Sequence, residues 1–190
     1  MPRAGVETPK SSYRHRVRPI LRQFRSTDAV AVLDAFADPE TARQGNVTDL
    51  DQAAAWISAM AAGRPDRHVF AVDLEGTAIG AVGVTAIDRE NLTGWFWYWL
   101  HRAHRGRGTA SGAAATVANS ALGSGGLERL ELGHRVTNPK SRAVAEAAGF
   151  VREGVERGKF LIAGTRVDVL TYGRLVTDPT PVTETFELRE

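Results

Sequence analysis

The chain has 190 residues, of which 24 are basic and 22 acidic, giving a formal net charge of +2, and it contains no cysteine. This length fits one domain, which can bury roughly 70% of the surface that its unfolded chain exposes. A chain without cysteine forms no disulfide, thiolate metal site or cysteine nucleophile, which favours a reducing compartment. The first residues lack the apolar core of a signal peptide, and no apolar stretch approaches ~20 residues, so we expect a cytoplasmic protein without a membrane segment. The balanced charge argues against a nucleic-acid partner.

The two ends of the chain differ in composition from its middle. Residues 1–16 contain proline, glycine and several basic residues, and residues 179–190 begin with two closely spaced prolines. We therefore expect mobile tails at both ends and one folded domain over residues 17–178. The basic cluster Arg14–Arg18 leaves contact with nucleic acid open as an alternative to a solvated tail.

The first third of the domain predicts a strand and two helices. Residues 17–24 have a strand-like pattern, which Pro19 confines to an edge or a strand start. A helix follows from Ser26 or Thr27 to about Ala37, before Pro39. Its inward stripe is predicted to include Val30, Leu33, Asp34 and Ala37. A second helix is predicted from Thr48 or Asp49 to Gly63.

Three antiparallel strands are predicted next. The apolar runs 69–74 and 78–87 flank Glu75-Gly76, a pair typical of a hairpin turn. The third run, Trp95–Leu100, is apolar on both faces, which indicates a central strand covered on both sides. A base-stacking platform is the alternative reading of so many aromatic residues.

The remaining elements alternate between helices and strands. An alanine-rich helix is predicted over 109–122, a strand over 127–136, and a helix that begins at Asn138-Pro139 and ends at Gly149. Two strand-like runs, 150–156 and 160–175, complete the domain, and the second is interrupted by a turn at Ala163-Gly164. The order predicts a single α/β domain with a mixed sheet.

A glycine loop, Arg105-Gly106-Arg107-Gly108-Thr109-Ala110, lies between the aromatic strand and the alanine-rich helix. Glycine lets the backbone approach a ligand closely, and the first N–H groups of a helix, with its dipole, favour an anion. The loop therefore predicts a pyrophosphate site. Many strand-to-helix turns carry glycine without a ligand, and the sequence matches neither the dinucleotide fingerprint nor the P-loop.

These residues resemble the GNAT superfamily of acyl-CoA-dependent N-acyltransferases, whose loop pattern is met by Arg105, Gly108 and Ala110. A second stretch, Asn138–Ser141 followed by Gly149–Gly154, resembles the branch that includes ribosomal-protein N-terminal acetyltransferases. The resemblance spans about residues 17–178. It implies a central, mostly antiparallel sheet in which two adjacent parallel strands splay apart, with flanking helices.

The resemblance also implies the chemistry. An amine attacks the thioester of acetyl-CoA directly and no metal takes part, while a backbone N–H near Leu100–Arg102 binds the thioester oxygen. Contacts with the coenzyme are expected from Leu100, Arg102, Arg105, Gly106, Arg107, Gly108, Thr109, Ala110, Asn138 and Ser141.

The proton-transfer groups are less directly indicated. Most of the superfamily places a tyrosine where this chain has Ala145, and in the related branch a serine at the position of Ser141 is the proposed acid. Ser141 is therefore a candidate acid, a coenzyme contact, or only a helix-start residue. Glu131 is the candidate base, and His134 and His101 are alternatives.

The acceptor amine is indicated only by charge. Carboxylates outnumber basic residues over residues 28–51, which form the acceptor wall in the family, so a cationic acceptor is expected. A protein or peptide α-amine, a polyamine and an aminoglycoside all fit, and so does a merely solvated acidic face. The alternative function is a non-catalytic acyl-CoA-binding sensor or interaction module. Monomer and homodimer both remain open.

Overall fold

The computed structural model describes residues 17–60 and 64–189. The predicted N-terminal tail and the expected end of the second helix at Gly63 lie outside these residues. The strands are β1 Ile20–Arg22, β2 His68–Leu74, β3 Thr77–Asp88, β4 Thr93–Leu100, β5 Arg129–Arg135, β6 Val151–Ile162, β7 Thr165–Leu175 and β8 Glu187–Arg189. The α-helices are α1 Ala29–Phe36, α2 Leu50–Met60, α3 Thr109–Leu122 and α4 Pro139–Ala147, with short 3-10 helices η1 Ser26–Asp28, η2 Ala42–Gln44 and η3 Arg102–His104.

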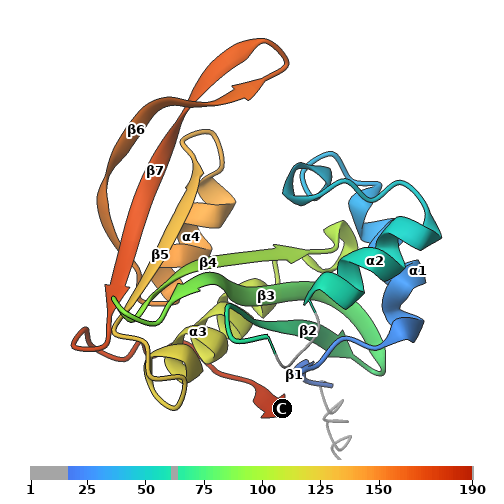
Figure 1. The fold of residues 1–190 in the computed structure, drawn as a ribbon, viewed down its shortest axis with the longest axis horizontal. Helices are drawn as coiled ribbons and strands as arrows, with labels where there is room; N and C mark the ends of the chain where they lie inside the picture. The colour runs from blue at the N-terminus through green and yellow to red at the C-terminus, as the bar shows by residue number, and fades with distance from the viewer. Residues whose placement is uncertain (1–16, 61–63, 190) are drawn as a thin grey trace, which may run out of the picture.

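The strands form one eight-stranded sheet in the order β6-β7-β5-β4-β3-β2-β1-β8 (Figure 1). The pairs β4–β5 and β1–β8 are parallel, and the other neighbours are antiparallel. This architecture confirms the predicted single α/β domain with a mostly antiparallel sheet. Within the described residues no helix is long and apolar enough to cross a membrane.

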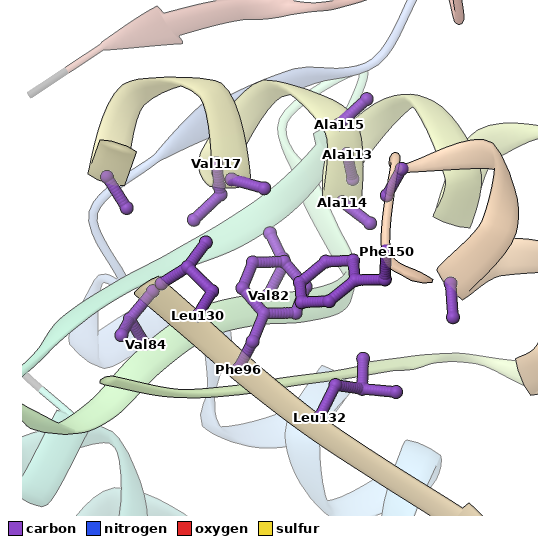
Figure 2. Packing of buried hydrophobic residues seen from close by; sticks show 14 of the residues in the cluster. Val82, Val84, Phe96, Ala113, Ala114, Ala115, Val117, Leu130, Leu132 and Phe150 are labelled. Carbon is purple, nitrogen blue, oxygen red and sulfur yellow. The ribbon is translucent and has the colours of Figure 1, made fainter. Parts of the chain in front are cut away.

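Helices cover both faces of the sheet. On one face the alanines of α3 approach β3 and β4, and Ala113 and Ala114 lie over Val82 and Phe96 (Figure 2). Small side chains let this helix pack close to the strands. On the other face α1 and α2 enclose a second cluster that contains Phe36, Ile57 and Trp99.

The aromatic strand β4 supplies side chains to both clusters. Phe96 and Trp99 are buried on opposite faces, as expected for a central strand. Trp95, at the start of the strand, is 36% exposed, so the two-sided covering does not extend to it. The predicted turn at Glu75-Gly76 is confirmed, since both residues have positive φ values, 54° and 86°.

The predicted inward stripe of the first helix is wrong except at Leu33, which is half-buried against the second cluster. Val32 and Phe36 are buried, whereas Val30 is 67% exposed. The phase of the helix is set by Asp28, which is buried and accepts two hydrogen bonds from Arg22, at 2.8 and 2.9 Å. Positions four and eight residues after a buried residue point the same way, so Val32 and Phe36 follow Asp28 inward.

The C-terminal segment differs from the tail that we expected after residue 178. It passes α3, and its strand β8 pairs in parallel with β1 (Figure 1). Gly112 makes this possible, because a Cβ there would come within 2.6 Å of the Phe186 ring. The Phe186 N–H also donates to Thr116 Oγ1 at 2.8 Å. The expectation of an unpacked tail rested on proline content alone, and it is wrong for this segment.

Candidate functional site

Strands β4 and β5 begin side by side and then separate. Their parallel pairing ends at Trp95 and Glu131, although β4 continues to Leu100 and β5 to Arg135. In Figure 1 the two strands point in different directions beyond this pair. The expected splay of the two parallel strands is thus confirmed, and it leaves one edge of β4 without a strand partner.

This free edge of β4 presents N–H groups. The His101 N–H donates to the Ile79 carbonyl at 2.8 Å, on the β3 side. Because backbone groups of successive strand residues point to opposite edges, the N–H and carbonyl of Leu100 and of Tyr98 face the gap. Both carbonyls already accept side-chain hydrogen bonds, Leu100 O from Arg105 Nε at 2.8 Å and Tyr98 O from Gln44 Nε2 at 2.9 Å. The gap is therefore lined by N–H donors, which suit a thioester oxygen.

The glycine loop leads from this edge to helix α3. Gly106 and Gly108 have φ values of 79° and 80°, in the left-handed region that glycine favours. A Cβ added at either glycine would meet no protein atom within 4 Å, so both glycines face open space. Gly108 is the N-cap of α3 and has no side chain to cap the first turn. The N–H groups of the first turn, beginning at Thr109, therefore suit a pyrophosphate.

The arginines of the loop differ in what they contact. Arg102 and Arg107 are exposed. Arg105 is only partly exposed, and besides Leu100 O it contacts Asp38 Oδ2 at 2.5 Å and Thr41 Oγ1 at 3.2 Å. The expectation that all three arginines face the coenzyme phosphates is therefore not matched by the contacts of Arg105.

The start of helix α4 has the predicted cap. Asn138 Oδ1 accepts from the Ser141 N–H at 3.1 Å, and Pro139 is in the first turn. Ala145 is fully buried in the core. The Ser141 carbonyl accepts a hydrogen bond from the Tyr98 hydroxyl at 2.9 Å, which ties α4 to the splayed part of β4. Sequence reasoning missed Tyr98, although strand alternation places it on the face of Phe96.

The candidate bases lie in different surroundings. Glu131 is on the sheet face opposite Leu130 and Leu132, and its carboxylate accepts from Arg129 Nε at 2.9 Å. Because Leu132 packs in the cluster beside α4, Glu131 and Ser141 lie on opposite sides of the sheet.

The two histidines are held by neighbouring groups. His134 is buried against the Tyr172 ring, and burial lowers the pKa of its imidazole. His101 contacts Asp34 through Nε2 at 2.9 Å.

Three of the six carboxylates of the acidic segment have an arginine partner. Asp28 pairs with Arg22, Asp38 with Arg105, and Glu40 with Arg135. These pairs neutralise much of the negative charge on which the expectation of a cationic acceptor rested. Among the residues that the structure describes, no group of histidine and acidic side chains could hold a metal ion.

Comparisons with known proteins agree with this geometry. Residues 18–151 match the model of the acetyltransferase (GNAT) domain. The chain is 32% identical over 108 residues to a ribosomal-protein-serine acetyltransferase of Escherichia coli K12, a match that covers 57% of this chain and 60% of that protein. It is 28% identical over 162 residues to p20 of Bacillus licheniformis, an uncharacterized N-acetyltransferase, covering 82% and 91% of the two chains.

Solved structures share the fold. RimL, a ribosomal L7/L12 alpha-N-protein acetyltransferase in complex with coenzyme A, superposes with a TM-score of 0.72 at 22% identity, covering 82% of this chain and 92% of that chain. RimJ of Mycobacterium smegmatis, in complex with a coenzyme A disulfide, gives 0.69 at 24% identity, with 83% and 84% covered. The family match extends over more than half of the chain and over the splayed strands and the glycine loop: the chain belongs to the GNAT acetyltransferase family.

Proposed function

We propose that this protein transfers an acetyl group from acetyl-CoA to a primary amine, with a protein or peptide α-amine as the first candidate acceptor and a small cationic amine as the second. The observation that carries the proposal is the edge of β4 that has no strand partner, where the facing carbonyls of Leu100 and Tyr98 already accept side-chain hydrogen bonds, beside the Gly106–Gly108 loop. One co-substrate could use both features, because it carries a carbonyl at one end and phosphates at the other. The similarity to a ribosomal-protein-serine acetyltransferase supports a protein α-amine and a cytoplasmic setting.

The coenzyme would lie along the loop and the gap. The backbone at Gly106, Gly108, Thr109 and Ala110 would bind the pyrophosphate, with Arg102 and Arg107 adding positive charge. The Leu100 N–H would donate to the thioester oxygen as it becomes an oxyanion. Asn138 and Ser141 would approach the coenzyme from the start of α4, where the helix dipole also favours a thiolate.

The reaction needs one proton removed and one supplied. The amine nitrogen attacks the thioester carbon and the carbon–sulfur bond breaks, so the nitrogen loses a proton and the departing sulfur gains one. Ser141, at the start of α4, is the proposed donor of a proton to the sulfur, and its hydroxyl would regain that proton from solvent water. Glu131, on the opposite face, is the proposed acceptor of the amine proton, directly or through water. Its bond with Arg129 would have to loosen or be bridged by that water.

A panel of amines tests this function. Peptides with free and with blocked α-amines, spermidine and an aminoglycoside are incubated with acetyl-CoA, and release of free thiol is followed together with the mass of the acceptor. We expect acetylation of at least one free amine and none of the blocked peptides. A protein that binds acetyl-CoA yet acetylates no member of the panel would support the alternative, a non-catalytic acyl-CoA sensor.

A further inference from the structure

We infer that Arg105 is a positioning residue that joins the coenzyme half of the site to the acceptor half, and is not a ligand of the coenzyme phosphates. The inference rests on the proposed function and concerns the same site. Arg105 is the first residue of the glycine loop, five positions after the end of β4. The loop pattern predicts that this arginine contacts the coenzyme, but its side chain contacts protein groups instead.

Two of the three guanidinium nitrogens of Arg105 are bound within the protein. Nε donates to Leu100 O at 2.8 Å, and Nη2 contacts Asp38 Oδ2 and, at 3.2 Å, Thr41 Oγ1. The side chain of Asp38 is 15% exposed and Thr41 is 1% exposed. The side chain of Arg105 itself is 29% exposed, so these contacts are partly shielded from water, and solvent competes with them less than with a fully exposed ion pair.

The charge of Arg105 is also balanced inside the protein. Burial alone would raise the pKa of Asp38, but the hydrogen bond and the positive charge of Arg105 outweigh it, and the net shift lowers the pKa of this carboxyl. Asp38 is therefore ionised at neutral pH, and its pair with Arg105 has no net charge. The exposed Arg102 and Arg107 are left to attract phosphate.

The contact with Leu100 fixes one peptide plane from both sides. The Leu100 carbonyl accepts from Arg105 Nε, and the N–H of the same peptide unit, that of His101, donates to Ile79 O at 2.8 Å. Because the peptide unit is planar, these two bonds set the orientation of the end of β4. They thereby aim the preceding N–H, that of Leu100, into the gap where the thioester oxygen is proposed to lie.

The other contacts reach the acceptor half. Asp38 and Thr41 belong to the connection between α1 and α2, which also sends Gln44 to the Tyr98 carbonyl and Glu40 to Arg135. This connection therefore touches β4, β5 and the glycine loop. Arg105 lies in the glycine loop, and its one side chain bonds both the end of β4 and the connection between α1 and α2. A change at Asp38 should therefore alter the affinity for the coenzyme.

Asp38→Asn separates the two roles of Arg105, because only the positioning role predicts a weaker affinity for acetyl-CoA. If Arg105 positions the loop, the weaker pairing should raise the Kd for acetyl-CoA, measured by calorimetry, about threefold to tenfold. If Arg105 binds phosphate through its remaining nitrogen, removal of the competing carboxylate should leave the Kd unchanged or lower it, and that result would overturn the inference. Thr41→Val removes only the weaker of the two contacts of Arg105 Nη2, and it should shift the Kd in the same direction as Asp38→Asn.

A double-mutant cycle with Arg105→Lys adds a second readout. Lysine keeps the charge but carries its donors on one nitrogen, so it cannot reproduce the planar fork whose Nε and Nη2 bind Leu100 O and Asp38 separately. Positioning predicts a fall in kcat of about tenfold to a hundredfold, and predicts that adding Asp38→Asn changes the Kd little further. If the effects of Arg105→Lys and Asp38→Asn on the Kd were additive, the two residues would not act through their mutual contact, and the inference would be contradicted. Arg64→Lys, at an exposed arginine paired with Asp66, is the matched control. Because binding is measured without an acceptor, a protein that acetylates nothing would refute the proposed function and still leave this test decisive.

Discussion

The hydroxyl of Tyr98 donates to the backbone carbonyl of Ser141 at 2.9 Å, and so connects the splayed part of β4 to the first turn of α4. Two candidate parts of the reaction centre, the donor edge of β4 and the helix that carries Ser141, are thus held together by one hydrogen bond. Their relative position then depends on a residue that need not touch the substrate.

Replacing Tyr98 with phenylalanine should therefore affect turnover more than coenzyme binding. Loss of the bond should lower the free energy of unfolding by about 1 kcal/mol. A small displacement of Ser141 should lower kcat by about threefold to tenfold with little change in the KM for acetyl-CoA. Tyr172→Phe is the matched control, since no partner of the Tyr172 hydroxyl occurs in the described part of the chain. Equal losses of kcat in the two variants would contradict a positioning role for Tyr98.

Tyr98 also predicts how stability changes at alkaline pH. Burial raises the pKa of Tyr98 from 10.0 to about 12. The unfolded chain then releases this proton at lower pH than the folded chain, so the stability present below about pH 10 should be lost as the pH rises towards 12. Denaturant unfolding at several pH values should show a shallower decline for Tyr98→Phe than for the parent protein. The same slope in both would mean that other groups dominate.

Ser141→Ala distinguishes the three roles that remain open for this serine. A contact with the departing sulfur strengthens as charge builds on it, so its loss lowers kcat and kcat/KM together. General acid help is typically worth about 10²- to 10⁴-fold, and we expect a fall in kcat of at least about tenfold. A change confined to the KM for acetyl-CoA would leave Ser141 as a coenzyme contact, and no change would leave it as a helix-start residue. Ser120→Ala, near the end of α3, controls for the loss of a helix hydroxyl.

Sequence patterns predicted the elements of this fold where the local signals agree with one another. Asn138-Pro139 begins α4 and Glu75-Gly76 turns the hairpin, because capping and turn geometry are decided by a few adjacent residues. The phase of α1 was predicted wrongly, because it depends on Asp28 being buried with Arg22. An ion pair between a strand and a helix leaves no trace in the apolar periodicity of either one.

The site shows the same division between local and distant contacts. The glycine loop was found from its own residues, whereas the two side-chain partners of Arg105, Thr41 and Asp38, lie 64 and 67 positions away in the chain. Tyr98 and Ser141 are 43 positions apart. The C-terminal strand was missed because its contact at Gly112 needs a missing Cβ on a helix that is already rich in small residues. Long-range contacts of this kind could not be read from spacing.

The buried pair of Arg22 and Asp28 predicts a strong effect of charge removal. Both residues are at most 5% exposed, and Arg22 also binds Asp73 at 2.6 Å. Arg22→Gln leaves two buried carboxylates without their cation, which should cost about 3–5 kcal/mol in the free energy of unfolding. The exposed Arg189→Gln should cost less than about 0.5 kcal/mol. Similar small losses in both variants would show that water reaches the pair.

The same pair predicts acid sensitivity. Burial is the largest single effect on the pKa of Asp28 and would raise it, but the hydrogen bonds from Arg22 and the Arg25 N–H, together with the charges of these two arginines, outweigh burial, and the net shift lowers the pKa. A lowered pKa contributes stability above the unfolded value, near 4, and that stability is lost as the pH falls towards the folded value. Unfolding of the parent protein between pH 6 and acid should therefore show a loss that begins below about pH 5. Arg22→Gln should show a smaller loss over this range, and a steeper one would contradict the assignment.

Gly108→Ala tests the coenzyme loop with a control that the fold itself provides. Gly108 and Gly76 have nearly the same left-handed backbone, with φ values of 80° and 86°, and an added Cβ would meet no protein atom within 4 Å at either position. Alanine should therefore lower the free energy of unfolding by a similar amount at both, about 1–2 kcal/mol.

Only at Gly108 would the new methyl group project from the loop proposed to hold the pyrophosphate. We expect Gly108→Ala to raise the Kd for acetyl-CoA at least about tenfold, as when one or two charge-assisted hydrogen bonds are displaced, and Gly76→Ala to leave the Kd unchanged, with both measured by calorimetry on folded protein. If the two variants lose stability equally and neither loses affinity, the pyrophosphate does not approach Gly108, and the proposed path of the coenzyme along the loop is wrong.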